Sequence, residues 1–321
     1  MVTVETGARL HFGFQNLSLA YDRLYGGIGV GLDEPALRIE TTAAQEVRCA
    51  DSELRSYVET AVDVLDVPGI AITVKERFGR HIGLGSGTQI ALACLVGIAD
   101  TYDLSIDPRQ TAPRLGRGGR SGVGVATFED GGFIIDSGHR STKFTTDPPN
   151  PGNWSVPEPI VQQPLPADWR FLVVTPETSP GNSGEAETSS MEATVESANP
   201  GIADDIAAVL TRSLLPSIAE QNIQQFGEAL ERIGRLNGAW YADEQGGVYR
   251  PPVGTLIEEL CKSRTVFGAG QSSWGPTVYG VTNKAQAQEA KDAGETAVKS
   301  SGLDGRVSIH TPSTDGYIST E

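Results

Sequence analysis

The first quarter of the chain alternates between strand-like and helix-like spacing of apolar residues. Val2–Phe14 is rich in β-formers and predicts a strand, and Gly26–Leu32 and Ala36–Thr42 predict two more. Glycine recurs within the second of these segments, which is typical of a strand that another backbone approaches closely. Between Ser52 and Leu65 apolar residues recur at helical spacing, and Ile70–Glu76 predicts a fourth strand.

A long apolar run and a glycine-rich segment dominate the next part of the chain. Ile90–Ala99 predicts a buried helix, and Pro108–Leu115 predicts a short one. The glycine-rich residues 115–125 are expected to lead into a strand. Glu129–Gly132 then predicts a hairpin turn before the strand Phe133–Asp136.

A polar, proline-rich stretch over Ser141–Asp168 predicts a long connection between two domains. We therefore expect an N-terminal domain over residues 1–150 and a C-terminal domain over residues 168–321. The elements expected in the second domain are strands over Arg170–Thr175 and Arg306–His310, a mobile loop over Pro180–Ser190, helices over Ile202–Ile218, Ile223–Asn237, Leu256–Cys261 and Lys284–Lys299, and a glycine turn followed by β-structure over Val266–Gly280.

The composition fits a globular enzyme and argues against several other classes. The 321 residues are 38% hydrophobic, which suits one large domain or two moderate ones. The sequence shows no signal peptide and no apolar span of roughly 18 residues, so we expect a cytoplasmic protein. Cys49, Cys94 and Cys261 are odd in number and far apart, which indicates neither a disulfide framework nor a zinc site.

The net charge of the chain limits the kinds of partner that it can bind. A net charge of −16 argues against binding to nucleic acid or to an anionic membrane. Of the 25 basic residues, 19 are arginine, and an acid-rich, lysine-poor surface suggests a halophilic source. An anionic substrate would need arginines gathered at its site to offset the field of the whole chain.

The segment His81–Gln89 carries the clearest chemical signal. Three glycines alternate with Leu84 and Ser86 just before the apolar helix, so backbone N–H groups and the helix N-terminus can face one anion. The predicted phosphate cradle consists of Gly83, Leu84, Gly85, Ser86, Gly87 and Thr88. The alternative is a turn that only caps a buried helix. The segment lacks the lysine of a Walker A loop and the setting of a Rossmann fingerprint.

The glycine segments, taken in order, resemble the GHMP kinase superfamily. Residues 83–87 before an alanine-rich helix look like its phosphate-binding motif, and Val266–Gly270 before a β-run looks like its C-terminal glycine motif. The resemblance implies an α+β fold of two domains. The first would have the ribosomal-S5-type fold and the second a ferredoxin-like fold, with the ligand between them.

Longer strings resemble one branch, the β-ribofuranosylaminobenzene 5′-phosphate synthases. These strings are Arg9–His11, Gly26–Gly29, Gly116–Gly124, Gly131–His139 and, most specific, Gly270–Gly280 with its Gln-Ser-Ser-Trp-Gly-Pro core. The resemblance implies a glycosyltransferase that joins phosphoribosyl pyrophosphate to 4-aminobenzoate or a related benzoate. Carbon dioxide and pyrophosphate would be lost, in a methanopterin-type biosynthesis of archaea.

The main alternative is an ATP-dependent small-molecule kinase of the same superfamily. Many such kinases place an aspartate where this chain has Gly124, and glycine cannot accept a substrate proton. Some of these kinases work without that base. A third alternative is a non-catalytic phosphate or nucleotide sensor.

The synthase chemistry suggests roles for particular residues. Arg9, His11, Arg117 and Arg120 are the candidate catalytic residues, and Gln271, Ser272, Ser273 and Trp274 are the candidates for an aromatic-substrate pocket. Each also has an ordinary structural alternative, as a core, surface or packing residue. Mg²⁺ is expected as cofactor without an organic one, but no metal ligands are indicated beyond Asp136 and His139, which equally suit a hairpin cap. A homodimer is compatible with the sequence.

Overall fold

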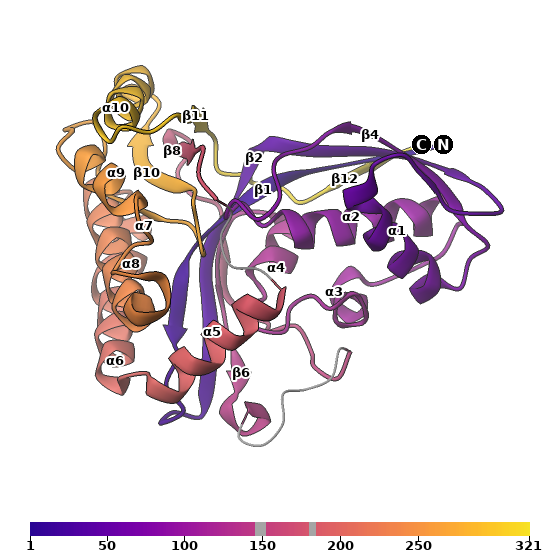
Figure 1. Ribbon diagram of the computed structural model, residues 1–321, viewed down its shortest axis with the longest axis horizontal. Coiled ribbons are helices and arrows are strands. Elements are labelled where there is room, and N and C mark those ends of the chain that lie inside the picture. The colour runs from indigo at the N-terminus through magenta and orange to yellow at the C-terminus, as the bar shows by residue number, and fades with distance from the viewer. Residues whose placement is uncertain (145–151, 180–183) are drawn as a thin grey trace.

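The computed structural model describes residues 1–144, 152–179 and 184–321, and its strands form two sheets (Figure 1). The larger sheet is built on β1 (Val2–Asn16) and β2 (Arg23–Ala43), which pair antiparallel along most of their lengths. It also contains β3 (Arg48–Cys49), β4 (Ile70–Glu76), β5 (Phe133–Asp136), β6 (His139–Arg140), β7 (Pro159–Gln163) and β12 (Ile318–Thr320). The two ends of the chain lie together at one end of this sheet (Figure 1).

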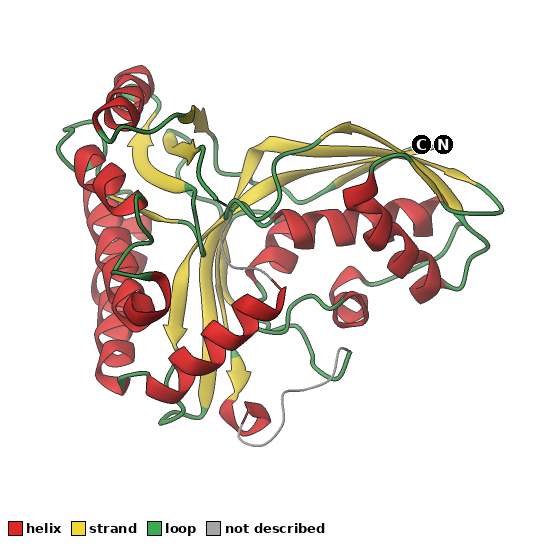
Figure 2. Cartoon of the chain, viewed as in Figure 1, coloured by secondary structure: helices red, strands yellow, loops and turns green. Residues whose placement is uncertain are grey.

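Helices pack on one face of the larger sheet because alternate residues of β1, such as Val2, Val4 and Leu10, are buried there. These helices are α1 (Ser52–Leu65), α2 (Ser86–Thr101), α3 (Pro108–Thr111) and α4 (Val123–Asp130), with a 3₁₀ turn at Ala112–Leu115 (Figure 2). Helix α2 is continuously buried from Gln89 to Ala99 and contacts both β1 and β2. The larger sheet therefore holds the start of α2 rigidly.

The smaller sheet is antiparallel, in the order β11-β8-β10-β9. Its strands are β8 (Trp169–Pro176), β9 (Ala269–Gln271), β10 (Val278–Asn283) and β11 (Gly305–His310). Helices α8 (Ile223–Gln245), α9 (Val253–Leu260) and α10 (Ala287–Ser300) contact this sheet. Helices α5 (Gly184–Ser197), α6 (Pro200–Val209) and α7 (Leu215–Ala219) pack on α8. Helix α8 contacts β1 as well as β9 and β10, so it bridges the two sheets. None of the helices within the described ranges is long and apolar enough to cross a membrane.

Several sequence predictions need correction. The two strands predicted over 26–32 and 36–42 form the single strand β2, because β1 pairs with both parts across one bulge. The strand predicted after residues 115–125 belongs to helix α4, and Gly131 and Gly132 end that helix instead of turning a hairpin. Val123, Val125, Ala126 and Phe128 are all buried, so α4 shows no helical periodicity in sequence.

Two further differences affect the domain limits. The expected connection 141–168 contains β7, which pairs with β5, and the end of the chain returns to the larger sheet as β12. Part of the expected loop 180–190 is helical, because α5 begins at Gly184 and buries Met191, Thr194 and Val195. Residues 145–151 and 180–183 lie outside the described residues.

Tyr317 joins the start of the C-terminal strand to helix α4, and removal of its ring should loosen that strand. Its ring stacks on Phe128 at 4.5 Å between centroids, and its N–H donates to the Phe128 carbonyl at 2.7 Å. We expect Tyr317→Ala to lower the free energy of unfolding by about 1–2 kcal/mol. Ile318→Ala is the matched control, since Ile318 is 60% exposed. Equal urea midpoints for the two variants would contradict this account.

Candidate active site

The predicted cradle has the geometry of an anion-binding turn. Gly83 and Gly85 have φ angles of +94° and +76°, a region that favours glycine. A Cβ on Gly83 would lie 2.4 Å from the Ser272 carbonyl, and one on Gly85 would lie 2.6 Å from Cγ of Arg9. The first α2 amides with an acceptor are those of Thr88 and Gln89, which donate to Gly85 O at 3.1 and 3.3 Å. The two amides before them, those of Ser86 and Gly87 at the start of α2, have no acceptor within the helix and are available to an anion.

A cavity of about 250 Å³, here named the cradle cavity, opens over this turn. Its lining residues are Arg9, Tyr57, His81, Gly83, Gly85, Ser86, Gly87, Thr88, Arg117, Glu187, Ser273, Trp274 and Gly275. Of the six residues predicted to bind phosphate, Leu84 alone is missing from this wall. Leu84 is buried, and its carbonyl accepts from the Arg9 N–H at 3.1 Å, so it fixes the turn to β1.

Arg9 and Arg117 supply positive charge to the cradle cavity. The Arg9 Nη1 donates to the Gly83 carbonyl at 3.0 Å, and burial lowers its pKa to about 10, which leaves it charged at neutral pH. The Arg117 guanidinium lies 5.3 Å from the centre of the Tyr57 ring. Its buried Nε has no hydrogen-bond partner, and no carboxylate among the described residues pairs with it. Arg117 is thus poised for an anionic ligand.

Sequence reasoning missed the aromatic support of these cations. Tyr57, on α1, also lies 5.2 Å from the Arg80 guanidinium and accepts from its Nη2 at 3.1 Å. In the sequence, the only indication of a further cation near the cradle was that Arg80 directly precedes the segment His81–Gln89. Tyr57 comes from a helix that the sequence identified only by its apolar face.

Arg120 does not line the cradle cavity. It forms an ion pair with Glu187 at 2.9 Å and donates to Thr188 Oγ1 at 2.8 Å, so it is anchored to α5. Glu187 does line the cavity, where its negative charge faces Arg9. The structure therefore separates the three predicted arginines into two at the cavity and one that positions a carboxylate beside it.

A second cavity, here named the aromatic cavity, adjoins the first. Its lining residues are His11, Phe12, Gly13, Phe14, Gly234, Asn237, Gly238, Tyr241, Gln245, Val248, Tyr249, Gln271, Ser273 and Trp274, and its volume is about 50 Å³. Ser273 and Trp274 belong to both cavities. The Trp274 ring packs on Tyr241 with 4.9 Å between centroids. Three of the four residues predicted for the aromatic pocket, Gln271, Ser273 and Trp274, are thus on its wall.

Ser272, the fourth, has a different place from the one predicted. It is fully buried, and its hydroxyl accepts from the His11 N–H at 3.1 Å and donates to the Gly83 carbonyl at 2.7 Å. The neighbouring Ser273 N–H donates to the His11 carbonyl at 3.0 Å. Ser272 therefore joins the glycine segment of the smaller sheet to β1 and to the cradle.

His11 is buried and lies at the head of a hydrogen-bonded row. Its Nε2 is 3.2 Å from Ser121 Oγ, which donates to Asp136 Oδ2 at 3.1 Å. Burial, and then the Arg9 charge, holds the His11 pKa well below its usual value. Burial raises the Asp136 pKa to about 6, against the opposing hydrogen bonds from Gly138, Gly122 and Ser121.

The remaining candidates have structural partners. His139 Nε2 lies 3.1 Å from the Gly118 carbonyl, and Asp136 accepts from the Gly122 and Gly138 amides at 2.7 and 2.8 Å. Within the described residues, no three His, Cys, Asp or Glu side chains gather as a metal site. At Gly124 a Cβ would contact the Thr88 side chain at 3.2 Å, so this position does face the cradle without offering a carboxylate.

Comparisons with known proteins agree with this architecture. Models of the GHMP kinases N-terminal domain and C-terminal region match residues 48–132 and 214–299. Among solved structures, Leishmania major mevalonate kinase has a TM-score of 0.67 at 14% identity, covering 97% of this chain and 96% of its own. Mevalonate pyrophosphate decarboxylase from Streptococcus pyogenes also scores 0.67, at 11% identity over 98% and 97%. These similarities establish the fold: α+β, in two domains.

Curated relatives are more similar in sequence. The β-ribofuranosylphenol 5′-phosphate synthase of Methanothermobacter thermautotrophicus is 30% identical over 296 residues, which is 88% of each chain. That of Archaeoglobus fulgidus is 30% identical over 289 residues, again 88% of each. The chain therefore belongs to the GHMP kinase superfamily, in the branch that contains the β-ribofuranosylphenol 5′-phosphate synthases.

Proposed function

We propose that this protein joins phosphoribosyl pyrophosphate to an aromatic acid, with loss of carbon dioxide and pyrophosphate. The observation that carries the proposal is the junction of two unlike cavities at Ser273 and Trp274. One cavity is a phosphate cradle with two arginines, and the other has an aromatic wall. A reaction between a phosphorylated donor and an aromatic acceptor needs both, side by side.

The acceptor is a benzoate with a para hydroxyl or amino group. The relatives are named for a ribosylphenol phosphate, which is the product that 4-hydroxybenzoate would give after losing its carboxylate. 4-Aminobenzoate would give the corresponding aniline. The aromatic cavity is narrow, at about 50 Å³, so we expect the Trp274 side chain to shift when a ring enters.

The cradle would stabilise the leaving group. As the bond between ribose C1 and pyrophosphate breaks, positive charge grows on the sugar and negative charge on pyrophosphate. The Ser86 and Gly87 amides at the start of α2 and the Arg117 guanidinium would hold that negative charge. Arg9, fixed by the Gly83 carbonyl, would neutralise it from the β1 side.

Mg²⁺ fits the same cavity. The Ser86 hydroxyl has no hydrogen-bond partner among the described residues, and Glu187 adds a carboxylate to the wall. Oxygen ligands of this kind suit Mg²⁺ that arrives with a pyrophosphate. When bound, the ion would neutralise charge on the leaving group. Ser86 and Glu187 are the residues of this chain that would hold the Mg²⁺ ion.

The first test compares donors and then measures turnover. Phosphoribosyl pyrophosphate with Mg²⁺ should raise the melting temperature more than ATP with Mg²⁺, because selective binding stabilises the folded state. Carboxyl-labelled 4-hydroxybenzoate or 4-aminobenzoate should then release labelled carbon dioxide. A larger rise in melting temperature with ATP, together with no labelled carbon dioxide from either acid, would favour the kinase alternative. Such a kinase would work without a base at position 124, where this chain has glycine.

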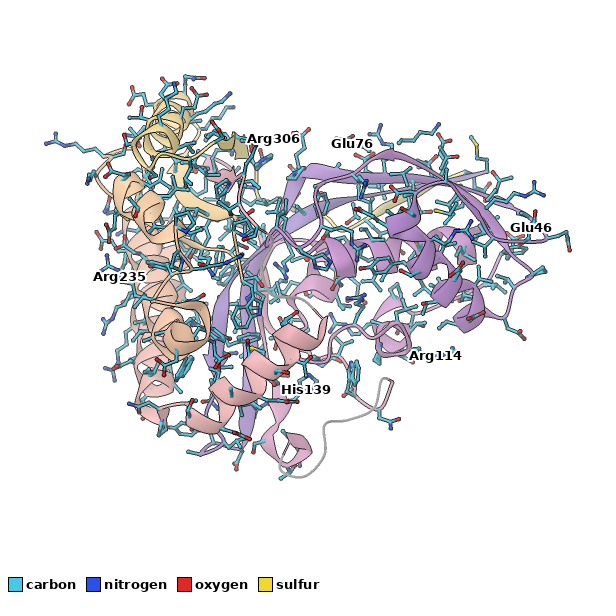
Figure 3. All side chains as sticks on the ribbon, in the orientation of Figure 1. Glu46, Glu76, Arg114, His139, Arg235 and Arg306 are labelled. Carbon is cyan, nitrogen blue, oxygen red and sulfur yellow. The ribbon has the colours of Figure 1, made fainter. Side chains whose placement is uncertain are left out.

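Arg117→Ala should weaken pyrophosphate binding by roughly 10- to 150-fold, since a charge-assisted hydrogen bond contributes about 1.5–3 kcal/mol. Arg120→Ala should have a smaller effect, because Arg120 is already paired with Glu187. Arg114→Ala is the matched control: Arg114, labelled in Figure 3, lies in the 3₁₀ turn Ala112–Leu115 outside both cavities, and its Nη2 donates to the Val64 carbonyl at 2.8 Å. The affinities are measured by calorimetric titration with pyrophosphate. If Arg117→Ala binds pyrophosphate as tightly as Arg114→Ala does, Arg117 lies outside the site.

Trp274→Ala should raise the KM for the aromatic acid by roughly 2- to 12-fold while leaving that for phosphoribosyl pyrophosphate nearly unchanged. An aromatic contact contributes about 0.5–1.5 kcal/mol beyond buried area, and Trp274 lies where the cavities meet. Trp274→Phe keeps a ring and should retain most of the affinity. Equal losses for both substrates would make Trp274 a packing residue.

A further inference from the structure

Three side chains from separate elements form one continuous hydrogen-bonded row beneath the aromatic cavity. His11 comes from β1, Ser121 from the loop before α4, and Asp136 from the end of β5. The Nε2–Oγ distance is 3.2 Å, and the Oγ–Oδ2 distance is 3.1 Å. His11 alone of the three reaches the cavity wall.

The glycines of β2 make room for this row. A Cβ on Gly27 would lie 2.1 Å from Ser121 Oγ and 2.9 Å from Asp136 Oδ2. Gly29 pairs directly with His11, where a Cβ would lie 2.6 Å from a methyl group of Val123. A larger side chain at Gly27 would displace the row, and one at Gly29 would clash with Val123 and with the Leu10 carbonyl, so both positions require glycine.

The hydrogen bonds fix which nitrogen of the imidazole carries its proton. A carboxylate can only accept hydrogen bonds, so the Ser121 hydroxyl donates its hydrogen to Asp136. Ser121 Oγ then accepts from the Val123 N–H at 3.2 Å and from Nε2 of His11. A neutral imidazole has one N–H, so Nδ1 bears a lone pair. No described residue forms a hydrogen bond with Nδ1.

The protonation states agree with this assignment. The Asp136 pKa, raised by burial to about 6, leaves the carboxyl ionised at neutral pH. The His11 pKa, lowered by burial and by Arg9, leaves the imidazole neutral. Asp136 also accepts hydrogen bonds from the Gly122 and Gly138 amides, so it would be held in place if it only capped these loops. That structural role does not explain the contact between Ser121 and His11.

We infer that Nδ1 of His11 accepts the proton of the acceptor's para hydroxyl or amino group, with Ser121 and Asp136 as positioning residues. This inference rests on the proposed function. The ring carbon that bears the carboxylate bonds to ribose C1 as the bond from C1 to pyrophosphate breaks. The O–H or N–H electron pair moves into the ring, and the proton goes to Nδ1. The bond between the ring carbon and the carboxylate then breaks, and carbon dioxide leaves. The electron pair of that bond stays with the ring and restores its aromaticity, and the proton returns from Nδ1 to the oxygen or nitrogen of the acceptor.

His11→Asn tests the inference, with His310→Asn as a matched control. His310 is also buried beside a serine, Ser308, but lies in β11 away from both cavities. His11→Asn should lower kcat for 4-hydroxybenzoate by about 10²- to 10⁴-fold and leave pyrophosphate binding unchanged. The loss should shrink along a series of fluorinated 4-hydroxybenzoates, whose hydroxyl ionises more readily and needs less help. An equal loss across the series would overturn the inference.

Nitrogen-15 NMR of the imidazoles provides a readout independent of turnover. The wild-type His11 should be the neutral tautomer protonated at Nε2, and Ser121→Ala should shift it toward a mixture of the two tautomers. An Nδ1-protonated wild-type His11 overturns the inference even if carbon dioxide is released. Failure of the wild type to release carbon dioxide from any acceptor, with the expected tautomer present, would instead contradict the proposed function.

Discussion

The buried hydroxyl of Ser272 determines how the two halves of the protein meet. Its two hydrogen bonds, from the His11 N–H and to the Gly83 carbonyl, join the segment after β9 of the smaller sheet to the strand β1 and to the cradle. The neighbouring amide of Thr277 adds a bond to the Ile82 carbonyl at 3.1 Å. Because a buried polar group is costly when unpaired, these contacts allow little sliding between the sheets. The cradle and the aromatic wall are consequently held in one relative position.

Close backbone packing is the second constraint, and it explains why glycine is concentrated where the chemistry is expected. Gly85 admits the Arg9 side chain against the start of α2, and Gly27 admits the row of Ser121 and Asp136. Gly85 lies at the cradle cavity, and Gly27 lies beside the row that begins at His11. Arg9 and the imidazole that we propose as proton acceptor, His11, are thus two residues apart on the same strand, β1.

The sequence predicted what depends on neighbours along the chain. The glycine turn before α2 was predictable because glycines followed at once by an apolar helix are a local signal, and helix α1 was predictable because its apolar spacing is regular. Helix α4 was not, since burial on all sides removes its periodicity. The row beginning at His11 was not predictable either: Ser121 is 110 positions away, and Asp136 reads in sequence as the end of a hairpin. The pairing of Arg120 with Glu187 likewise follows from folding, because α5 was expected to be a loop.

The most direct test is a crystal structure with phosphoribosyl pyrophosphate, Mg²⁺ and 4-hydroxybenzenesulfonate, an acceptor analogue that cannot lose carbon dioxide. The account predicts pyrophosphate on the first amides of α2 beside Arg117. It predicts the aromatic ring in the cavity between His11 and Trp274, with its substituted carbon facing ribose C1. A ring bound outside that cavity, or a pyrophosphate held away from the cradle, would contradict it.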